Sequence, residues 1–183
     1  MAALHAMLLG LLVLCTAPLH AEGPDGAAEA RIKAAFLYKF TGYVTWPSGA
    51  FDQADAPFVI AVMQADDIAA ELDKLTSGRN VNGHNVVVRR LTAGEATTGA
   101  QVLFIGSAAS ARINRALAAT RALPVLTITE LDESPIQASV INFVVVDEQV
   151  RFDVSLPVAE RNMLKISSRL LAVARQVVPG GQQ

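Results

Sequence analysis

The sequence contains few of the residues on which most catalytic and metal sites depend. Only one of its 183 residues is a cysteine, and three are histidines. A nucleophilic triad needs a base, usually a histidine, and a zinc site needs about three or four His, Cys or acidic ligands at close spacing. Two of the histidines, His5 and His20, lie near the start, which leaves His84 alone in the rest of the chain. The sequence therefore predicts no metal site, no cofactor and no enzymatic activity.

Charge is also missing from the start of the chain. Residues 1–21 contain no Asp, Glu, Lys or Arg. Their apolar run, residues 7–14, is too short to cross a bilayer, which takes roughly 20 residues. Helix-breaking Pro18 and small residues follow it, a pattern typical of a secretory signal peptide cut after Ala21. Loss of the signal removes Cys15 as well, so the exported protein is expected to have neither disulfides nor a thiol nucleophile.

The rest of the chain has the length of one ordinary domain. We expect a flexible polar leader at residues 22–27, a single domain at residues 28–179 and a short tail at residues 180–183. The formal net charge is −2, so net charge attracts neither nucleic acid nor an anionic membrane. No later apolar run is long and charge-free enough to span a bilayer, which predicts a soluble exported domain.

Apolar residues at helical spacing fill the start of the predicted domain, residues 28–47. They recur every three or four positions, which predicts an amphipathic helix with one broad apolar face on a core. Lys33 falls off this face and is expected to lie in water, and Pro47 prevents the helix from continuing. The residues of the predicted apolar face are Ile32, Phe36, Leu37, Phe40, Tyr43 and Val44.

The middle of the chain alternates apolar runs of strand length with helical patterns. Such alternation predicts parallel strands joined by right-handed crossovers. Asp66 or Asp67 is placed to cap the first of these helices. The predicted strands are residues 58–62, 86–89, 102–105 and 125–128, and the predicted helices are residues 66–75 and 108–120.

The end of the chain predicts a hairpin followed by a helix. Residues 140–146 and 150–154 are strands separated by a hairpin-length turn, and Arg151 and Asp153 face away from the apolar side of the second strand. Pro157 is placed in the first turn of a helix expected to run to about residue 178. The predicted fold class is therefore a layered α/β sandwich. It has a central mixed, mostly parallel sheet, with the N-terminal amphipathic helix and the C-terminal hairpin plus helix packed on it.

Five segments of the chain, taken in order, carry a family resemblance. The most distinctive is KAAFLYKFTGYVTWP at residues 33–47, and the others are residues 78–83, 103–106, 150–154 and 164–171. Together they resemble the YfiR-like family of periplasmic regulators over nearly the whole exported chain. This chain has Ala138-Ser139 where the family usually has a glycine pair, and Ser155 where it has an asparagine. It also lacks the cysteines that pair in some relatives, so a redox-sensing role is not expected.

The resemblance implies regulation, not catalysis. The known function in this family is that of a periplasmic repressor, which binds the periplasmic domain of an inner-membrane diguanylate cyclase and holds the cyclase inactive. An outer-membrane lipoprotein can sequester the repressor, which raises cyclic di-GMP and biofilm formation. The resemblance also implies a domain that tends to form homodimers. Under this leading hypothesis the partner contacts would use Tyr38, Tyr43 and Trp46 beside the first helix, and Arg151 on the polar side of the terminal strand.

Two other hypotheses come from the residues themselves. Gly106 and Ser107 end a strand and begin a helix, where backbone N–H groups can hold an anion, although ordinary strand-to-helix turns look the same. The alternative function is therefore a small-ligand-binding periplasmic sensor with a pocket at this turn. The third is a hydrolase that uses Ser107 and His84, but no serine-elbow motif marks such a site.

Overall fold

The computed structural model describes residues 24–51, 53, 55–92, 95–107, 110–131 and 138–181. The predicted signal peptide, residues 1–21, lies outside this part of the chain, as do residues 22–23 of the predicted leader. No helix among the described residues has the length and hydrophobicity that a membrane crossing requires.

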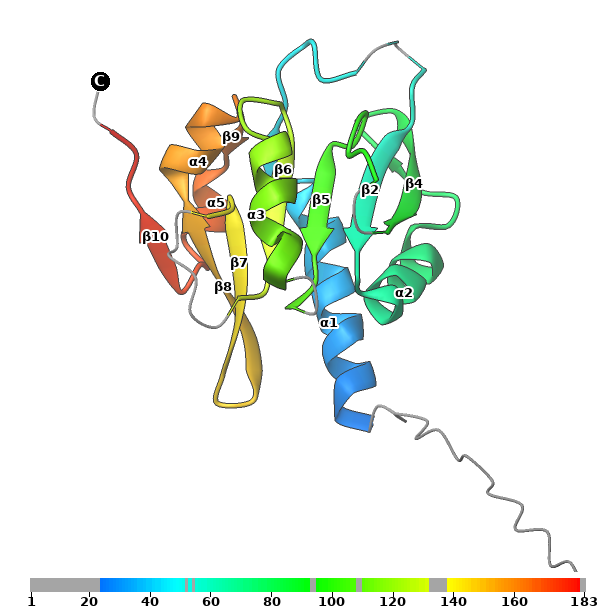
Figure 1. Cartoon of the computed structure of the whole chain (residues 1–183), viewed down its shortest axis with the longest axis vertical. Coiled ribbons are helices and arrows are strands. Elements are labelled where there is room, and N and C mark those ends of the chain that lie inside the picture. The colour runs from blue at the N-terminus through cyan, green and yellow to red at the C-terminus, as the bar shows by residue number, and fades with distance from the viewer. Residues whose placement is uncertain are drawn as a thin grey trace, which may run out of the picture.

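Within the described residues, eight strands form one mixed sheet in the order β10-β8-β7-β6-β5-β2-β4-β3 (Figure 1). The neighbours from β7 through β6, β5 and β2 to β4 are parallel, and β10 is parallel to β8. The β7–β8 and β3–β4 pairs are antiparallel. The strands are β2 Phe58–Met63, β3 Asn80–Val81, β4 His84–Leu91, β5 Val102–Ile105, β6 Leu126–Thr129, β7 Ile141–Val146, β8 Gln149–Ser155 and β10 Gln176–Val178.

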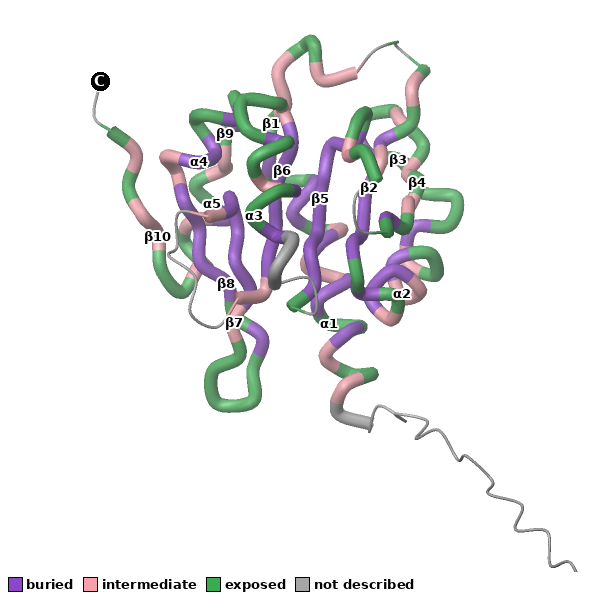
Figure 2. Tube along the Cα trace, viewed as in Figure 1, coloured by how far each residue is buried: buried purple, intermediate pink, exposed green. Residues whose placement is uncertain are grey.

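Helices cover both faces of this sheet. Helices α1 (Pro24–Phe40) and α2 (Asp66–Thr76) pack on one face, where their side chains share a core with Phe58, Ile60 and Phe104 of the strands. Helix α3 (Ser110–Ala119) packs on the other face, where Ile113 contacts the core around Leu103. In Figure 1 α3 lies in front of the sheet and α1 behind it, and Figure 2 shows the central strands buried between them. The predicted α/β fold class is confirmed.

The first helix packs on the last hairpin through aromatic rings. Phe40 meets Phe152 of β8 edge-on with ring centroids 4.9 Å apart, and it stacks on Phe143 of β7 at 5.9 Å. Offset and edge-on pairs of this kind add about 0.5–1.5 kcal/mol each to the energy of burial. Residues close to the start of the domain are therefore held by residues close to its end.

The helix exists as predicted, but its buried face is rotated. Ile32 and Tyr43 are 46% and 40% exposed, whereas Ala30, Ala34 and Leu37 are buried together with Phe40. Lys33 was expected in water, yet it is only 8% exposed. The helix lies close along α2 and meets the hairpin through its aromatic rings, and these two contacts determine which face is buried.

The ends of α1 also differ from the prediction. It begins at Pro24, so residues 24–27 of the expected leader are helical, and it ends at Phe40. Residues beyond it form the short strand β1 (Val44–Thr45), which pairs antiparallel with β9 (Lys165–Ile166) in a separate ribbon.

The predicted continuous helix from Pro157 to about residue 178 is wrong beyond its first turns. The chain forms α4 (Leu156–Arg161), β9, α5 (Ser168–Leu171) and then β10. Asn162 interrupts α4 because its buried side chain donates to the Val125 carbonyl oxygen (2.9 Å), and Met163 follows with a left-handed φ of 57°. The turn directs the chain into β9 and later places β10 beside β8.

The hairpin itself is confirmed, with a two-residue turn. Val146 pairs with Gln149, and the residues between them, Asp147 and Glu148, both have positive φ, as in a type I′ turn. Asp153 faces away from the apolar side as predicted, but it is 2% exposed. It accepts two hydrogen bonds from the Arg175 guanidinium, which β10 and its preceding turn bring alongside.

Candidate functional site

The sheet has a point at which the chain turns in opposite directions. From β2 the chain passes through α2 to β4 on one side, and from β5 it passes through α3 to β6 on the other side. The two helices cover opposite faces, so a crevice forms between the carboxyl ends of the neighbouring strands β2 and β5. In open α/β sheets, ligands bind in such crevices.

The turns that follow β2 and β5 touch at this crevice. The Gly106 N–H donates to the Met63 carbonyl oxygen at 2.9 Å. A Cβ atom at Gly106 would lie 2.5 Å from the Gln64 carbonyl oxygen, closer than a carbon can approach, so only glycine fits here. The contact fixes the spacing of the two turns.

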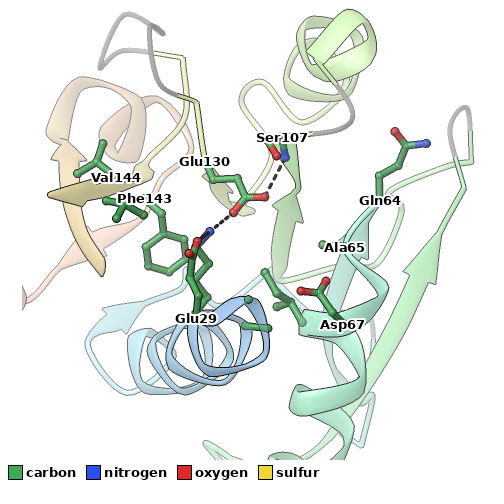
Figure 3. Close-up of a pocket in the computed structure, with 13 residues that line it drawn as sticks. Glu29, Gln64, Ala65, Asp67, Ser107, Glu130, Phe143 and Val144 are labelled. Carbon is green, nitrogen blue, oxygen red and sulfur yellow. Dashed lines mark hydrogen bonds and ion pairs between the residues drawn. The ribbon is translucent and has the colours of Figure 1, made fainter. Parts of the chain in front are cut away.

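A cavity of about 440 Å³ lies beside this contact (Figure 3). Its walls are the first half of α1, the start of α2, the turns after β5 and β6, and part of β7. Six lining residues have charged or polar side chains: Glu29, Lys33, Gln64, Asp67, Ser107 and Glu130. The rest of the lining is largely apolar, including Ala30, Ile68 and Phe143.

A charged network joins α1 to the sheet at the wall of the cavity. The Lys33 Nζ lies 2.5 Å from Oε2 of Glu130 and 2.5 Å from Oε1 of Glu29. The other Glu130 oxygen, Oε1, accepts the backbone N–H of Ser107 at 2.9 Å. The side chains of Lys33 and Glu130 are 10% and 15% exposed, whereas that of Glu29 is 40% exposed. The network is therefore buried at its centre and opens to water at Glu29.

The environment of Lys33 keeps it charged. Burial alone lowers the pKa of Lys33, but hydrogen bonds and opposite charges from Glu130 and Glu29 outweigh burial and raise that pKa above its ordinary value. Lys33 is thus a cation at any physiological pH, and two of its possible hydrogen bonds are made within the protein.

The structure contradicts two expectations about Ser107, namely that its N–H is free to bind an anion and that it pairs with His84. The Ser107 N–H was considered as a donor to an anion, but it is already bonded to Glu130. His84 lies at the amino end of β4, where its ring stacks on Phe51 at 3.9 Å and its Nδ1–H donates to the Ala56 carbonyl oxygen. Ser107 instead follows the carboxyl end of β5. Because β4, β2 and β5 are parallel, Ser107 and His84 lie at opposite ends of the sheet and cannot form a catalytic pair.

Of the lining residues only Ser107 was predicted as part of a pocket, and the charged network was missed because the sequence does not show which carboxylate meets which helix. Glu29 and Lys33 are four residues apart on a helix, a spacing that often forms an ion pair. Glu130 directly follows β6, and side chains in that position line the carboxyl edge of a parallel sheet. These two signals indicate the network, but only the fold brings them together.

The structure places the four partner-binding candidates in two regions. Tyr43 and Trp46 flank β1, and Tyr38 lies on α1 with the Arg79 guanidinium 5.5 Å from its ring centroid. Trp46 is half-buried, packs edge-on against Phe58 at 5.1 Å, and donates from Nε1 to the Gln101 carbonyl oxygen. Tyr38 is also half-buried, so of these three only Tyr43 is exposed.

Arg151 lies apart from the other three candidates. It is exposed on β8, opposite Val144 in the β7–β8 hairpin. Figure 2 shows this hairpin and β1 at opposite ends of the molecule. The structure therefore does not bring the candidates into one patch.

Comparison with known proteins identifies a family. The model of the YfiR/HmsC-like family matches residues 30–175, which span the fold from the first turns of α1 to the residue before β10. No curated protein matches the chain. At the level of the family, the match supports a periplasmic regulator of the diguanylate cyclase kind, in agreement with a function other than catalysis. The chain belongs to the YfiR/HmsC-like family.

Proposed function

We propose that this protein is exported to the periplasm, where it binds the periplasmic domain of an inner-membrane diguanylate cyclase and holds the cyclase inactive. Its action lowers cyclic di-GMP and biofilm formation. The observation that carries the proposal is the family match over residues 30–175. The match extends over nearly all of the described fold and is not limited to one motif. An outer-membrane lipoprotein that removes the free repressor, and a homodimeric state, complete the proposal.

The mechanism is differential binding. The repressor binds the inactive state of the cyclase more tightly than the active state, so its free concentration sets the fraction of active enzyme. A shift from about 99% active to about 1% active requires a preference of roughly 10⁴-fold. Sequestration by a lipoprotein reverses the shift without any chemical change in the repressor.

We propose two separate contact regions, one at Tyr43 and one at Arg151, the two exposed members of the candidate set. Tyr43 offers an aromatic ring that is already 40% exposed at the β1–β9 ribbon. Large aromatic and arginine side chains provide much of the binding energy of protein interfaces. Tyr38 and Trp46 are half-buried, so their replacement is expected to affect folding as well as binding.

The experiment combines capture of the partner with a measurement of cyclic di-GMP. The tagged protein is crosslinked in its native envelope and the captured proteins are identified by mass spectrometry. We expect an inner-membrane protein with a diguanylate cyclase domain, and we expect deletion of the repressor to raise cyclic di-GMP. Failure to capture a cyclase, together with unchanged cyclic di-GMP after deletion, would refute the proposal.

Point variants then test the surface. Tyr43→Ala and Arg151→Ala are each expected to weaken repression while the urea midpoint of unfolding stays close to wild type. Val87→Ala is a matched control, because Val87 is 44% exposed on β4 and points to the face of the sheet opposite α1. Equal repression by all three variants would remove these residues from the interface without affecting the proposal that a cyclase is bound.

A further inference from the structure

We propose that the cavity at the carboxyl ends of β2, β5 and β6 binds a small organic cation, a primary amine attached to an apolar body. This inference goes beyond cyclase repression and does not depend on it. It rests on three observations about the same cavity: its position and size, its charge, and its apolar wall.

Position and size fit a ligand site. The cavity adjoins the crevice between β2 and β5, where ligands bind in open α/β sheets. Its volume of about 440 Å³ falls within the roughly 300–1,000 Å³ of typical small-molecule sites. The contact between Gly106 and the turn after β2 keeps this edge of the sheet rigid, so the cavity is formed in advance.

The charge of the lining selects a cation. Three carboxylates, those of Glu29, Asp67 and Glu130, line the cavity with one ammonium group, that of Lys33. Figure 3 shows the three carboxylates around one space. Lys33 offsets only one of these negative charges, and within the described residues no side chain pairs with Asp67. An anion would face a net negative lining and would find the Ser107 N–H already bonded.

The remaining lining selects an organic ligand over a metal ion. Among the described residues, no cluster of His, Cys, Asp and Glu is arranged to hold a metal. The walls provide apolar contact instead, from Ala30 and Ile68 on the helices and Phe143 and Val145 on β7. A site that combines apolar contacts with charged groups around one space fits a molecule with an apolar body and a single charged end.

The test uses three probes of similar shape and different charge. They are 2-phenylethylamine, a cation at neutral pH, the neutral 2-phenylethanol and the anion 3-phenylpropanoate. Binding to the purified exported protein is measured by titration calorimetry and by NMR chemical-shift changes. We expect the amine to bind at least about tenfold more tightly than the alcohol, the anion to bind weakest, and shifts at Phe143 and Ile68.

Two neighbouring substitutions separate cavity charge from overall charge. Asp67→Asn removes a carboxylate from the lining, whereas Asp66→Asn removes an equal charge from the same helical turn outside the lining. Asp67→Asn is expected to weaken amine binding about fivefold or more and to leave binding of the alcohol unchanged, while Asp66→Asn changes amine binding less than about twofold. Equal effects of the two variants, tighter binding of the alcohol or the anion, or no amine binding at millimolar concentration would overturn the proposal.

Discussion

Replacement of Lys33 by methionine tests the central contact between α1 and the sheet. Methionine keeps the unbranched shape of the side chain but leaves the Glu130 carboxylate, which is 15% exposed, without its cation. Loss of one partner from a fully buried pair costs roughly 3–5 kcal/mol. Glu130 keeps its bond from the Ser107 N–H and a little contact with water, and the half-exposed Glu29 adds almost nothing. We therefore expect Lys33→Met to lower the free energy of unfolding by about 2–3 kcal/mol.

The assay is urea unfolding at neutral pH, followed by fluorescence and circular dichroism. For a domain of this size the expected loss corresponds to a decrease in Tm of roughly 5–10 °C. The double variant Lys33→Met/Glu130→Gln should recover about 1–2 kcal/mol of the summed losses, because glutamine still accepts from Ser107 and carries no buried charge. Lys74→Met, which breaks an exposed pair with Glu71, is the control and should leave stability nearly unchanged. Additive losses in the double variant would refute a buried ion pair between Lys33 and Glu130.

The same contact has a defined pH dependence. The pKa of Lys33 is raised above its ordinary value of 10.5 in the folded protein. Its contribution is therefore fully present below pH 10.5 and is lost as the pH rises through the raised value. The difference in unfolding free energy between wild type and Lys33→Met, measured by urea unfolding at each pH, should stay constant from neutral pH to pH 10 and shrink above it.

Two further pairs of substitutions test the close approach at Gly106 and the buried charge at Asp153. Gly106→Ala should cost about 1–3 kcal/mol in urea unfolding, because its Cβ would meet the Gln64 carbonyl oxygen, whereas Gly49→Ala, which has open space, should cost far less. Equal costs would show that the two turns do not touch. Arg175→Met should destabilise the protein more than Asp153→Asn. The first change leaves the Asp153 carboxylate, which is 2% exposed, without its cation, whereas the second leaves unpaired an Arg175 side chain that is 42% exposed to water. The reverse order would contradict the buried position of Asp153.

The central strands could be predicted closely because burial on both faces leaves a plain pattern. β5, at the middle of the sheet, matches the predicted residues 102–105, since a strand covered by helices on both sides is apolar at every position. The hairpin was predicted from a different signal, the alternation of Val150, Phe152 and Val154 with polar residues after a hairpin-length turn, and the turn contains only Asp147 and Glu148. Local pattern and tertiary burial agree in these elements.

The end of the chain could not be predicted because a distant contact overrides its local pattern. Ile166, Leu170, Val173 and Val177 recur at helical spacing, yet Val173 is 68% exposed and Val177 lies in β10. The interruption depends on the hydrogen bond from Asn162 to Val125, which lies 37 positions earlier. A hydrophobic period contains no information about such a bond.

The candidate cavity was predicted in position but not in chemistry. The turn at Ser107 does line it, as the ligand-binding alternative required, but the expected anion donor is bonded to Glu130. Lys33 was assigned to water because its own helix offers no reason to bury it. Its partner Glu130 is 97 residues away, and only the sheet topology brings the two together.

The packing of the first helix on the last hairpin also determines the order in which the protein can fold. The chain emerges from the ribosome with its N-terminus first, so α1 is complete long before β7 and β8 have been made. Phe36 and Phe40 stack only on each other until Phe143 and Phe152 arrive. Contacts between such distant segments form late and slow the folding of a domain. The aromatic face of α1 therefore lacks its partner in the sheet until the hairpin has been made, and docking of that face closes the core.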